Sequence, residues 1–205
     1  LQGILQSTER AASLAGQMLA YSGKGRFTLE QLDPARLVSG MADLLRSLAP
    51  KKVALALEIS TDIPSIHADA AQIRQLIVSL VSNAAEAIGE REGTITLRLA
   101  QVHATRQLLA PLHQSGELPE GNYVQLTITD DGCGMDEATQ ARVFEPFFTT
   151  KFTGRGLGLA AALGIMHAHR GAIGIKSAPG RGTTVTILLP GVGVSPPARE
   201  AGIPL

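Results

Sequence analysis

The sequence is poor in residues that several common kinds of site require. It has no tryptophan and only 3% aromatic residues, which argues against the stacking platforms that bind single-stranded nucleic acid. The single cysteine, Cys133, excludes an intrachain disulfide and a multi-cysteine metal site, and it fits a reducing compartment. There is no apolar run long enough to cross a bilayer, and the first residues lack the basic-then-apolar pattern expected of a secretion signal. We therefore expect a cytoplasmic piece without direct membrane contact, which is compatible with a membrane-anchored parent protein.

Net charge is also missing. The 18 basic and 18 acidic residues cancel to a formal charge of zero, so no global field attracts nucleic acid or an anionic membrane. Any polyanion must then be bound by a local site. The 205 residues are 44% hydrophobic, which suits one globular domain with an appendage.

The hydrophobic pattern divides the chain into three segments. Residues 1–25 carry an apolar stripe at steps of three, four and seven, which predicts one long N-terminal helix. Residues 26–190 alternate between helix and strand patterns with few βαβ units, and this predicts an α+β domain with a mixed, largely antiparallel sheet. Residues 191–205 are rich in glycine and proline, and we expect a flexible linker there.

Within the middle segment, local signals place individual elements. A helix is predicted over residues 34–48, with Asp33 as its cap, and a long helix over residues 70–88, with Asp69 as its cap. The polar, proline-containing stretch at about 104–120 separates two strand patterns, so we expect a long surface hairpin loop.

Three alternating glycines stand directly before a helix pattern in "TTKFTGRGLGLAA". Bare backbone amides at a helix N-terminus form a good anion site, and the nearby Lys151 and Arg155 suit a triphosphate. The dinucleotide fingerprint fails because Leu159 stands where its third glycine should be, and the P-loop pattern is absent. A flexible loop with close helix packing is the alternative interpretation.

A second polar feature lies on the predicted helix over residues 70–88. Asn83 and Glu86 project toward one edge of its apolar face. Asn83 either forms a hydrogen bond with neighbouring backbone or offers its carbonyl oxygen to Mg²⁺, a hard cation that shares its shell with phosphates and water. Taken by itself, the pattern of this helix favours the backbone hydrogen bond as the role of Asn83.

The stretch "ITDDGCGMDEA" places two carboxylates and two glycines at the end of a strand pattern, whereas a simple turn would need one glycine. With this stretch included, five motifs resemble, in order, the N box, first glycine box, F box, second glycine box and final Gly-Thr motif of the ATP-binding domain of bacterial sensor histidine kinases: "NAAEA", "DDGCGM", "FEPFFTTK", "GRGLGL" and "GRGTTVTILLP". The superfamily also includes gyrase, MutL and heat-shock chaperone ATPases.

The resemblance covers about residues 34–190. It implies a two-layer α/β sandwich of the Bergerat type, in which helices cover one face of a mixed sheet. Residues 1–25 resemble the second helix of the dimerisation and histidine-phosphotransfer hairpin of these kinases, which implies a homodimer in the full-length protein.

The resemblance also assigns the adenine site. Asp130 would accept a hydrogen bond from the adenine amino group, supported by Thr183, and Gly132 and Gly134 would let the backbone pass close to the base. An ionised aspartate only accepts hydrogen bonds, so it would select the amino edge of adenine over the carbonyl edge of guanine.

The phosphate side of the site follows in the same way. Asn83 would ligate Mg²⁺, and the segment at about 135–156 would be a mobile lid that orders on nucleotide. The phosphates are expected near Lys151, near Arg155 as a weaker candidate, and near the backbone of Gly156, Leu157 and Gly158.

Several neighbours of the site are expected to have structural roles. We expect Asp131 to stay solvated in the turn and Cys133 to be small filler between glycines. The F-box aromatics would pack the lid against the domain, with plain core burial as the alternative; they are Phe144, Phe147 and Phe148.

Two departures from the family pattern bear on activity. Ser79 stands four residues before Asn83, where relatives that hydrolyse ATP carry a glutamate base; serine is a poor base, which favours transfer to a supplied acceptor over hydrolysis. No histidine in the chain is followed by an acidic residue as the family's acceptor is, and His167 and His169 are expected to be surface or cap residues. We therefore expect no catalytic residue here and a phospho-acceptor histidine outside this chain.

The leading hypothesis is the ATP-binding catalytic part of a two-component sensor histidine kinase. It would use ATP and Mg²⁺ to phosphorylate a histidine, for relay to the receiver domain of a response regulator. The alternatives within the enzyme class are a serine-phosphorylating relative and a gyrase-type ATPase. A degenerate kinase that acts as a nucleotide-binding, docking or dimerisation module is the alternative from another class.

Overall fold

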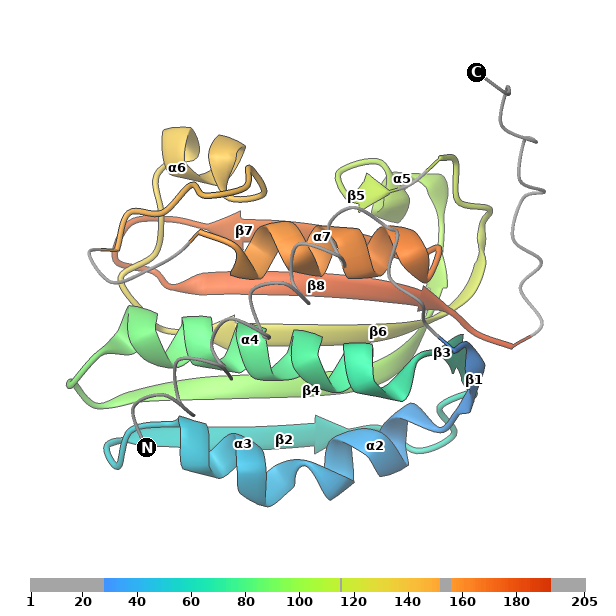
Figure 1. The fold of residues 1–205 in the computed structure, drawn as a ribbon, viewed down its shortest axis with the longest axis horizontal. Coiled ribbons are helices and arrows are strands. Elements are labelled where there is room, and N and C mark those ends of the chain that lie inside the picture. Colours follow the sequence, from blue (N-terminus) through green and yellow to red (C-terminus); the bar gives the residue numbers. More distant parts are fainter. Residues whose placement is uncertain (1–27, 115, 152–155, 193–205) are drawn as a thin grey trace, which may run out of the picture.

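The computed structural model describes residues 28–114, 116–151 and 156–192. They form a curved main sheet with helices on one face, and a separate small pair of strands (Figure 1). The predicted N-terminal helix, Arg155 and all but the first two residues of the predicted linker lie outside the described residues.

The main sheet has six strands. Its order is β2 (Val53–Ile59), β4 (Gly93–Ala104), β6 (Gly121–Asp130), β8 (Thr183–Pro190), β7 (Ala172–Ser177) and β5 (His113–Gln114). Strand β2 runs parallel to β4, and every other neighbouring pair is antiparallel. A separate antiparallel pair joins β1 (Glu30–Leu32) to β3 (Ile66–Ala68). The mixed, largely antiparallel sheet predicted from the sequence is confirmed.

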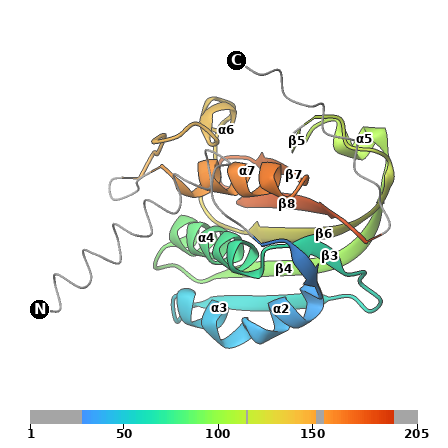
Figure 2. The same cartoon turned by 45° about the vertical axis from the view of Figure 1, so that its right-hand side comes forward.

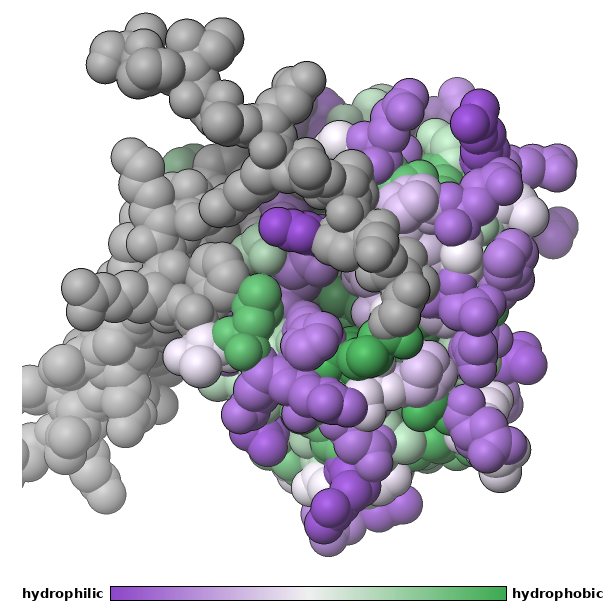
Figure 3. Space-filling model, turned by 90° about the vertical axis from the view of Figure 1, so that its right-hand side faces the viewer, coloured by the Kyte–Doolittle hydropathy of each residue, from purple (hydrophilic) through white to green (hydrophobic). Residues whose placement is uncertain are grey.

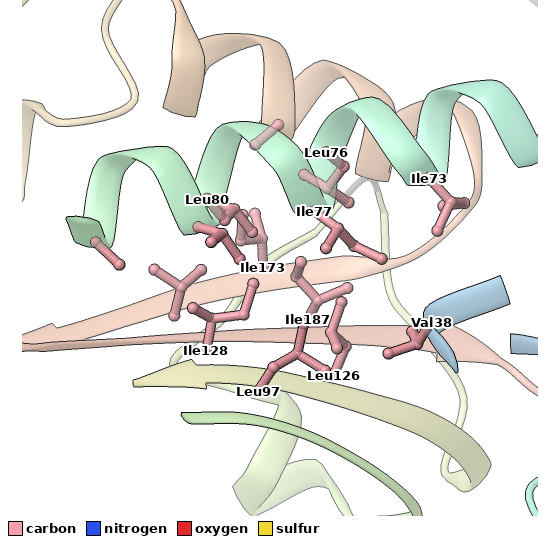
Figure 4. Packing of buried hydrophobic residues seen from close by; sticks show 14 of the residues in the cluster. Val38, Ile73, Leu76, Ile77, Leu80, Leu97, Leu126, Ile128, Ile173 and Ile187 are labelled. Atoms are coloured by element: carbon pink, nitrogen blue, oxygen red, sulfur yellow. The ribbon is translucent and has the colours of Figure 1, made fainter. Parts of the chain in front are cut away.

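Four helices cover the sheet on one side, which makes the molecule a two-layer sandwich (Figures 1 and 2): α2 (Pro34–Gly40), α3 (Ala42–Leu48), α4 (Ala70–Ile88) and α7 (Gly158–Ala168). The apolar side of α4 packs directly on the strands (Figure 4), where its Leu76 and Ile77 and the strand residues Leu97 and Ile187 are almost fully buried. Burial of such side chains is the main favourable term in folding.

The outer surface is polar by comparison. The end of the sheet where β1 and β3 lie is mostly hydrophilic, with small hydrophobic patches between polar side chains (Figure 3). Within the described ranges, none of the helices is both long and apolar enough to cross a membrane.

Helix α4 begins and ends where the sequence predicts. The Asp69 side chain accepts hydrogen bonds from the backbone N–H groups of Ala71 and Gln72, and Gly89 ends the helix with a φ of +70°. An oxygen-bearing cap and a glycine with positive φ are the usual start and stop signals of a helix.

The continuous helix predicted over residues 34–48 is wrong. It breaks at Met41, whose N–H turns back to the carbonyls of Val38 and Ser39, so that α2 and α3 are separate. The weak helix formers Ser39 and Gly40 precede the break, and the bend keeps Val38, Met41 and Leu45 all buried on the core side.

The stretch predicted as a long surface hairpin loop at about 104–120 does connect two antiparallel neighbours, β4 and β6, but it is not a simple loop. This stretch contains a one-turn helix, α5 (Arg106–Leu109), and the short strand β5, which extends the sheet beyond β7. Its leucines build a small second core with Tyr123, whose hydroxyl donates to the Pro119 carbonyl at 2.8 Å. Such short elements have no periodicity that a sequence pattern can reveal.

Two loops at one end of the sheet touch through glycines. The loop after β6 contains Gly134 with a φ of +67°, and the turn between β7 and β8 contains Gly180 with a φ of +71°. The Gly180 N–H donates to the Cys133 carbonyl at 2.7 Å. A Cβ atom on Gly134 would collide with the Ala178 carbonyl oxygen, whereas one on Gly180 would meet nothing within 4 Å. Glycine at position 134 therefore lets the loops approach.

His169 joins the far end of α7 to the start of α4. It is the C-cap residue of α7, as expected, but it is buried rather than on the surface. Its Nδ1 lies 2.8 Å from the Ile165 carbonyl oxygen, and its Nε2 accepts from the Asp69 N–H at 3.0 Å. This geometry requires a neutral ring with the proton on Nδ1. Burial lowers the pKa of His169, outweighing its hydrogen bond to Ile165 and the charge of Asp69, which raise it.

Acidification should lower the free energy of unfolding through His169. Above the ordinary pKa of 6.5 the ring is neutral in both states; below it the unfolded chain takes up a proton that the folded chain accepts only at lower pH. Each unit by which folding lowers the pKa corresponds to about 1.4 kcal/mol. Urea unfolding from about pH 7.5 to 5 should show this loss, and His169→Gln should reduce the slope.

The exposed His67 provides the matched control, since His67→Gln should leave the slope as it is in the wild type. Equal slopes for the wild type and His169→Gln would contradict the assignment.

Gly134→Ala should destabilise the domain more than Gly180→Ala. Both changes place an alanine at positive φ, which costs about 1 kcal/mol, but only Gly134→Ala adds a collision with the Ala178 carbonyl, worth about 1–3 kcal/mol more. Urea unfolding of the two variants measures the difference, and equal losses would mean that the loops are not held together by this approach.

Candidate functional site

A cavity of about 560 Å³ opens between α4, the N-terminus of α7 and the ends of β6 and β8. It brings together polar residues that are far apart in the sequence. Most of the predicted site residues line it: Asn83, Asp130, Gly134, Lys151, Gly156, Leu157, Gly158 and Thr183. Gly132 is not among the lining residues but contacts Asp130 directly.

Asp130 is the buried carboxylate of the cavity. It is the last residue of β6, with Ile95 of β4 and Thr183 of β8 opposite it, and it is only 7% exposed. Its Oδ1 accepts from the Gly132 N–H at 2.8 Å. Burial raises the pKa of Asp130, although the backbone N–H groups of Gly132 and Thr183 and the charge of Lys151 act in the opposite direction. The carboxylate is thus a fixed hydrogen-bond acceptor at the base of the cavity.

The loop after β6 needs glycine next to this carboxylate. A Cβ atom on Gly132 would lie 2.6 Å from Asp130 Oδ1 and 2.7 Å from the Ala87 side chain. The following Cys133 N–H donates to the Ala87 carbonyl at 3.0 Å. The loop is therefore pressed against the end of α4, and only glycine fits there.

Thr183 belongs to a hydrogen-bond network that the sequence did not reveal. The Ser177 hydroxyl donates to the Gly182 carbonyl and accepts from the Met135 N–H, and its oxygen lies 2.9 Å from Thr183 Oγ1. The Gln140 side chain donates to the carbonyls of Ser177 and Met135 and accepts from the Ser177 N–H. These partners are up to 42 residues apart, so no local sequence pattern indicates that Ser177 and Gln140 belong to this network.

Asn83 and Ser79 face the beginning of α7. A Cβ atom on Gly158 would lie 3.0 Å from Ser79 Oγ and 3.3 Å from Asn83 Nδ2, so glycine permits this contact between the helices. The residue before α7, Leu157, makes no side-chain cap hydrogen bond. The first N–H groups of α7 thus lie beside the Asn83 amide, with the partial positive charge of a helix N-terminus.

Lys151 and Glu86 form an ion pair in the cavity. The Lys151 Nζ lies 2.6 Å from Glu86 Oε2, and the side chains are 38% and 58% exposed. Lys151 is the only lysine or arginine among the described residues that line the cavity. Sequence reasoning placed Lys151 near the phosphates and Glu86 beside Asn83 at one edge of its helix, but did not predict that they pair.

The three F-box aromatics differ in burial and in contacts. Phe144 is buried in the main core, and Phe148 lines the cavity with the Arg142 guanidinium 4.2 Å from its ring centre. Phe147 is 63% exposed, so its predicted packing is wrong. Its φ of +67° and the hydrogen bond from its N–H to the Gly156 carbonyl accompany this exposed position. Ordering of the predicted lid on nucleotide stays a prediction.

Two expectations about the loop after β6 have different outcomes. Asp131 is exposed, as expected, but its carboxylate also accepts from the Thr94 N–H at 3.0 Å and lies 3.5 Å from the Arg91 guanidinium, which donates to the Asp131 carbonyl. Cys133 is exposed and lines the cavity instead of filling space between glycines. Asp131 thus ties the loop to β4, and Cys133 faces the site.

The amino-acid sequence is similar to sensor kinases. It is 38% identical over 192 residues to the sensor kinase CckA of Brucella abortus, covering 93% of this chain and 20% of that protein. It is 30% identical over 191 residues to the signal transduction histidine-protein kinase AtoS of Escherichia coli, covering 93% of this chain and 28% of that protein. The chain therefore spans less than a third of the length of these relatives.

Solved structures share the fold. The ShkA structure in complex with AMPPNP matches with a TM-score of 0.70 at 24% identity, covering 95% of this chain and 39% of that one. The mycobacterial sensor histidine kinase MprB matches with a TM-score of 0.63 at 23% identity, covering 80% of this chain and 98% of that one.

The family model for the histidine kinase-, DNA gyrase B-, and HSP90-like ATPase matches residues 68–192. This range begins at the end of β3 and contains the whole cavity. The chain therefore belongs to the histidine kinase-, DNA gyrase B- and HSP90-like ATPase family, and its described residues form an ATP-binding domain of the sensor histidine kinase type.

Proposed function

We propose that this chain binds ATP through Asp130 and, with Mg²⁺, transfers the γ-phosphoryl group to a histidine that the chain does not itself supply. The observation that carries this proposal is one cavity with a buried carboxylate at its base and an amide, a helix N-terminus and a lysine along one side. This arrangement matches a ligand with a hydrogen-bonding base at one end and anionic phosphates at the other.

Asp130 would recognise the adenine. A carboxylate held by backbone N–H groups and buried in the cavity can accept a hydrogen bond from an exocyclic amino group but cannot donate one. Guanine presents a carbonyl at the corresponding edge and would be rejected. Ser177 and Thr183 would fix the ends of the two strands on one side of this contact, β7 and β8.

The phosphates would lie at the other end of the cavity. The N–H groups at the start of α7, including those of Leu157 and Gly158, and the Lys151 ammonium are the donors available there. Arg155, outside the described residues, remains a further candidate from the sequence.

Asn83 would ligate the Mg²⁺. A single amide oxygen fits this ion, which keeps several waters and binds mainly to the phosphates of its nucleotide. No cluster of three or more histidine, cysteine, aspartate or glutamate side chains able to hold a metal occurs in the described part of the chain. The ion would then arrive with the nucleotide, and when bound it would neutralise charge on the phosphates during transfer.

The composition of the cavity favours phosphoryl transfer over hydrolysis. Its only carboxylates among the described lining residues are Asp130, at the base, and Glu86, paired with Lys151. Ser79, in the position where hydrolysing relatives carry a base, is a poor base. None of the five histidines lines the cavity, so the acceptor would be presented by another helix, and catalysis would consist of positioning and charge neutralisation.

The remaining partners follow from this role. The phosphoryl group would pass to the receiver domain of a response regulator in the cytoplasm, and the full-length protein would dimerise through residues 1–25, which carry the apolar stripe. The docking-module alternative has no structural observation in its favour, because Asn83, Asp130 and the glycines meet in one cavity.

Asp130→Asn should weaken binding of a non-hydrolysable ATP analogue at least about tenfold, because one of the acceptor positions becomes a donor. Calorimetric titration measures this loss. Asp131→Asn is the matched control, since Asp131 does not line the cavity and asparagine can still accept from Thr94. An unchanged affinity for Asp130→Asn would rule out the adenine contact, and no binding by a folded wild-type chain would favour a docking module.

Phosphoryl transfer should be visible when this chain is mixed with labelled ATP and a separate fragment that carries an acceptor histidine on a hairpin of this kinase type. Transfer should require Mg²⁺ and fall at least about a hundredfold in Asn83→Ala, because the metal loses its protein ligand. Binding of the analogue without Mg²⁺ should change little in this variant. Equal transfer rates for the wild type and Asn83→Ala would contradict the metal role.

A further inference from the structure

The ion pair between Lys151 and Glu86 occupies the side of the cavity where the phosphates are proposed to lie. Glu86 is on α4, one turn after Asn83, and its carboxylate lies 2.6 Å from the Lys151 ammonium. Both residues line the cavity. The pair therefore stands inside the proposed phosphate site rather than on a remote surface.

The fold depends little on this pair. Ion pairs between side chains exposed to this degree, 38% and 58%, add little to the free energy of unfolding. Neither residue belongs to the hydrophobic core. The pairing is therefore better explained by its effect on a ligand than by its effect on folding.

Carboxylates of the cavity and the phosphates of a bound nucleotide would compete for Lys151. Among the described lining residues it is the one basic side chain, opposed by the carboxylates of Glu86 and Asp130. A triphosphate brings further negative charge to the same region. A lysine ammonium is a compact point charge on a flexible stem, so it can leave one anion for another when the second is stronger.

We propose that Glu86 sets the affinity of the site for nucleotide phosphates by holding Lys151 in the nucleotide-free protein, so that Lys151 must exchange from this carboxylate to a phosphate when nucleotide binds. This inference rests on the proposed function and adds to it a residue that tunes affinity. Without the negative charge of Glu86, Lys151 would be available at once, and binding would be tighter.

The test is a double-mutant cycle with a non-hydrolysable ATP analogue in the presence of a metal chelator. Glu86→Gln should tighten binding about three- to tenfold, and Lys151→Gln should weaken it. In the Lys151→Gln background, Glu86→Gln should have no further effect, because the competition has been removed. Adenosine, which has no phosphate, should bind the wild type and Glu86→Gln equally.

A matched control separates the ion pair from net charge. Glu90→Gln removes the same charge just beyond the end of α4, at an exposed position that does not line the cavity, and should leave the affinity unchanged. Urea unfolding of Glu86→Gln without ligand should show a loss no larger than the gain in binding, about 0.6–1.4 kcal/mol for a three- to tenfold change, because the pair that competes with the phosphates also stabilises the free protein.

Three outcomes would overturn the proposal that Lys151 exchanges from Glu86 to a phosphate. Equal or weaker binding by Glu86→Gln would show that Glu86 does not compete. Undiminished tightening in the Lys151→Gln background would show that Glu86 acts on the phosphates by repulsion alone. Failure of the folded wild-type chain to bind the analogue would overturn the proposed function itself, and with it this inference.

Discussion

The rest of the molecule depends on the packing of α4 against the sheet. Its apolar side, with Ile77 and Leu80, is buried on the strands, and the 3.6-residue period of a helix then places Ser79, Asn83 and Glu86 toward the cavity. A rotation of α4 about its axis would expose apolar surface and remove these polar groups from the site together. The hydrophobic effect thus sets the position of polar groups that do not themselves drive folding.

Both ends of α4 are also tied to the parts that complete the site. At its start, the Asp69 N–H binds His169 at the end of α7; at its end, the Ala87 carbonyl accepts from Cys133 in the loop that follows Asp130. Helix α7 and the loop after β6 are therefore both positioned by contacts with α4. This explains how the Asp130 carboxylate and the N-terminus of α7, which come from distant segments, can contact one ligand.

Local signals in the sequence were sufficient to predict the helix α4 and the order of the site motifs. Asp69 and Gly89 mark the helix ends because capping involves only nearby backbone. Local signals fail where the decisive contact is distant: Lys151 meets Glu86 across 65 residues, and Gln140 meets Ser177 across 37. The structure of residues 104–120 was missed for a similar reason, since its small core forms only with β6 and the strands beyond it.

The contacts of Gln140 have a consequence for solubility. Strand β7 would be a sheet edge, and exposed edges recruit strands from other chains. Near its beginning it pairs with the two residues of β5, and at its last residue, Ser177, the Gln140 side-chain amide bonds to the backbone N–H and C=O as a neighbouring strand would. The short helix that carries Gln140, α6 (Glu137–Arg142), and the two-residue strand β5 therefore also protect the domain against edge-to-edge aggregation.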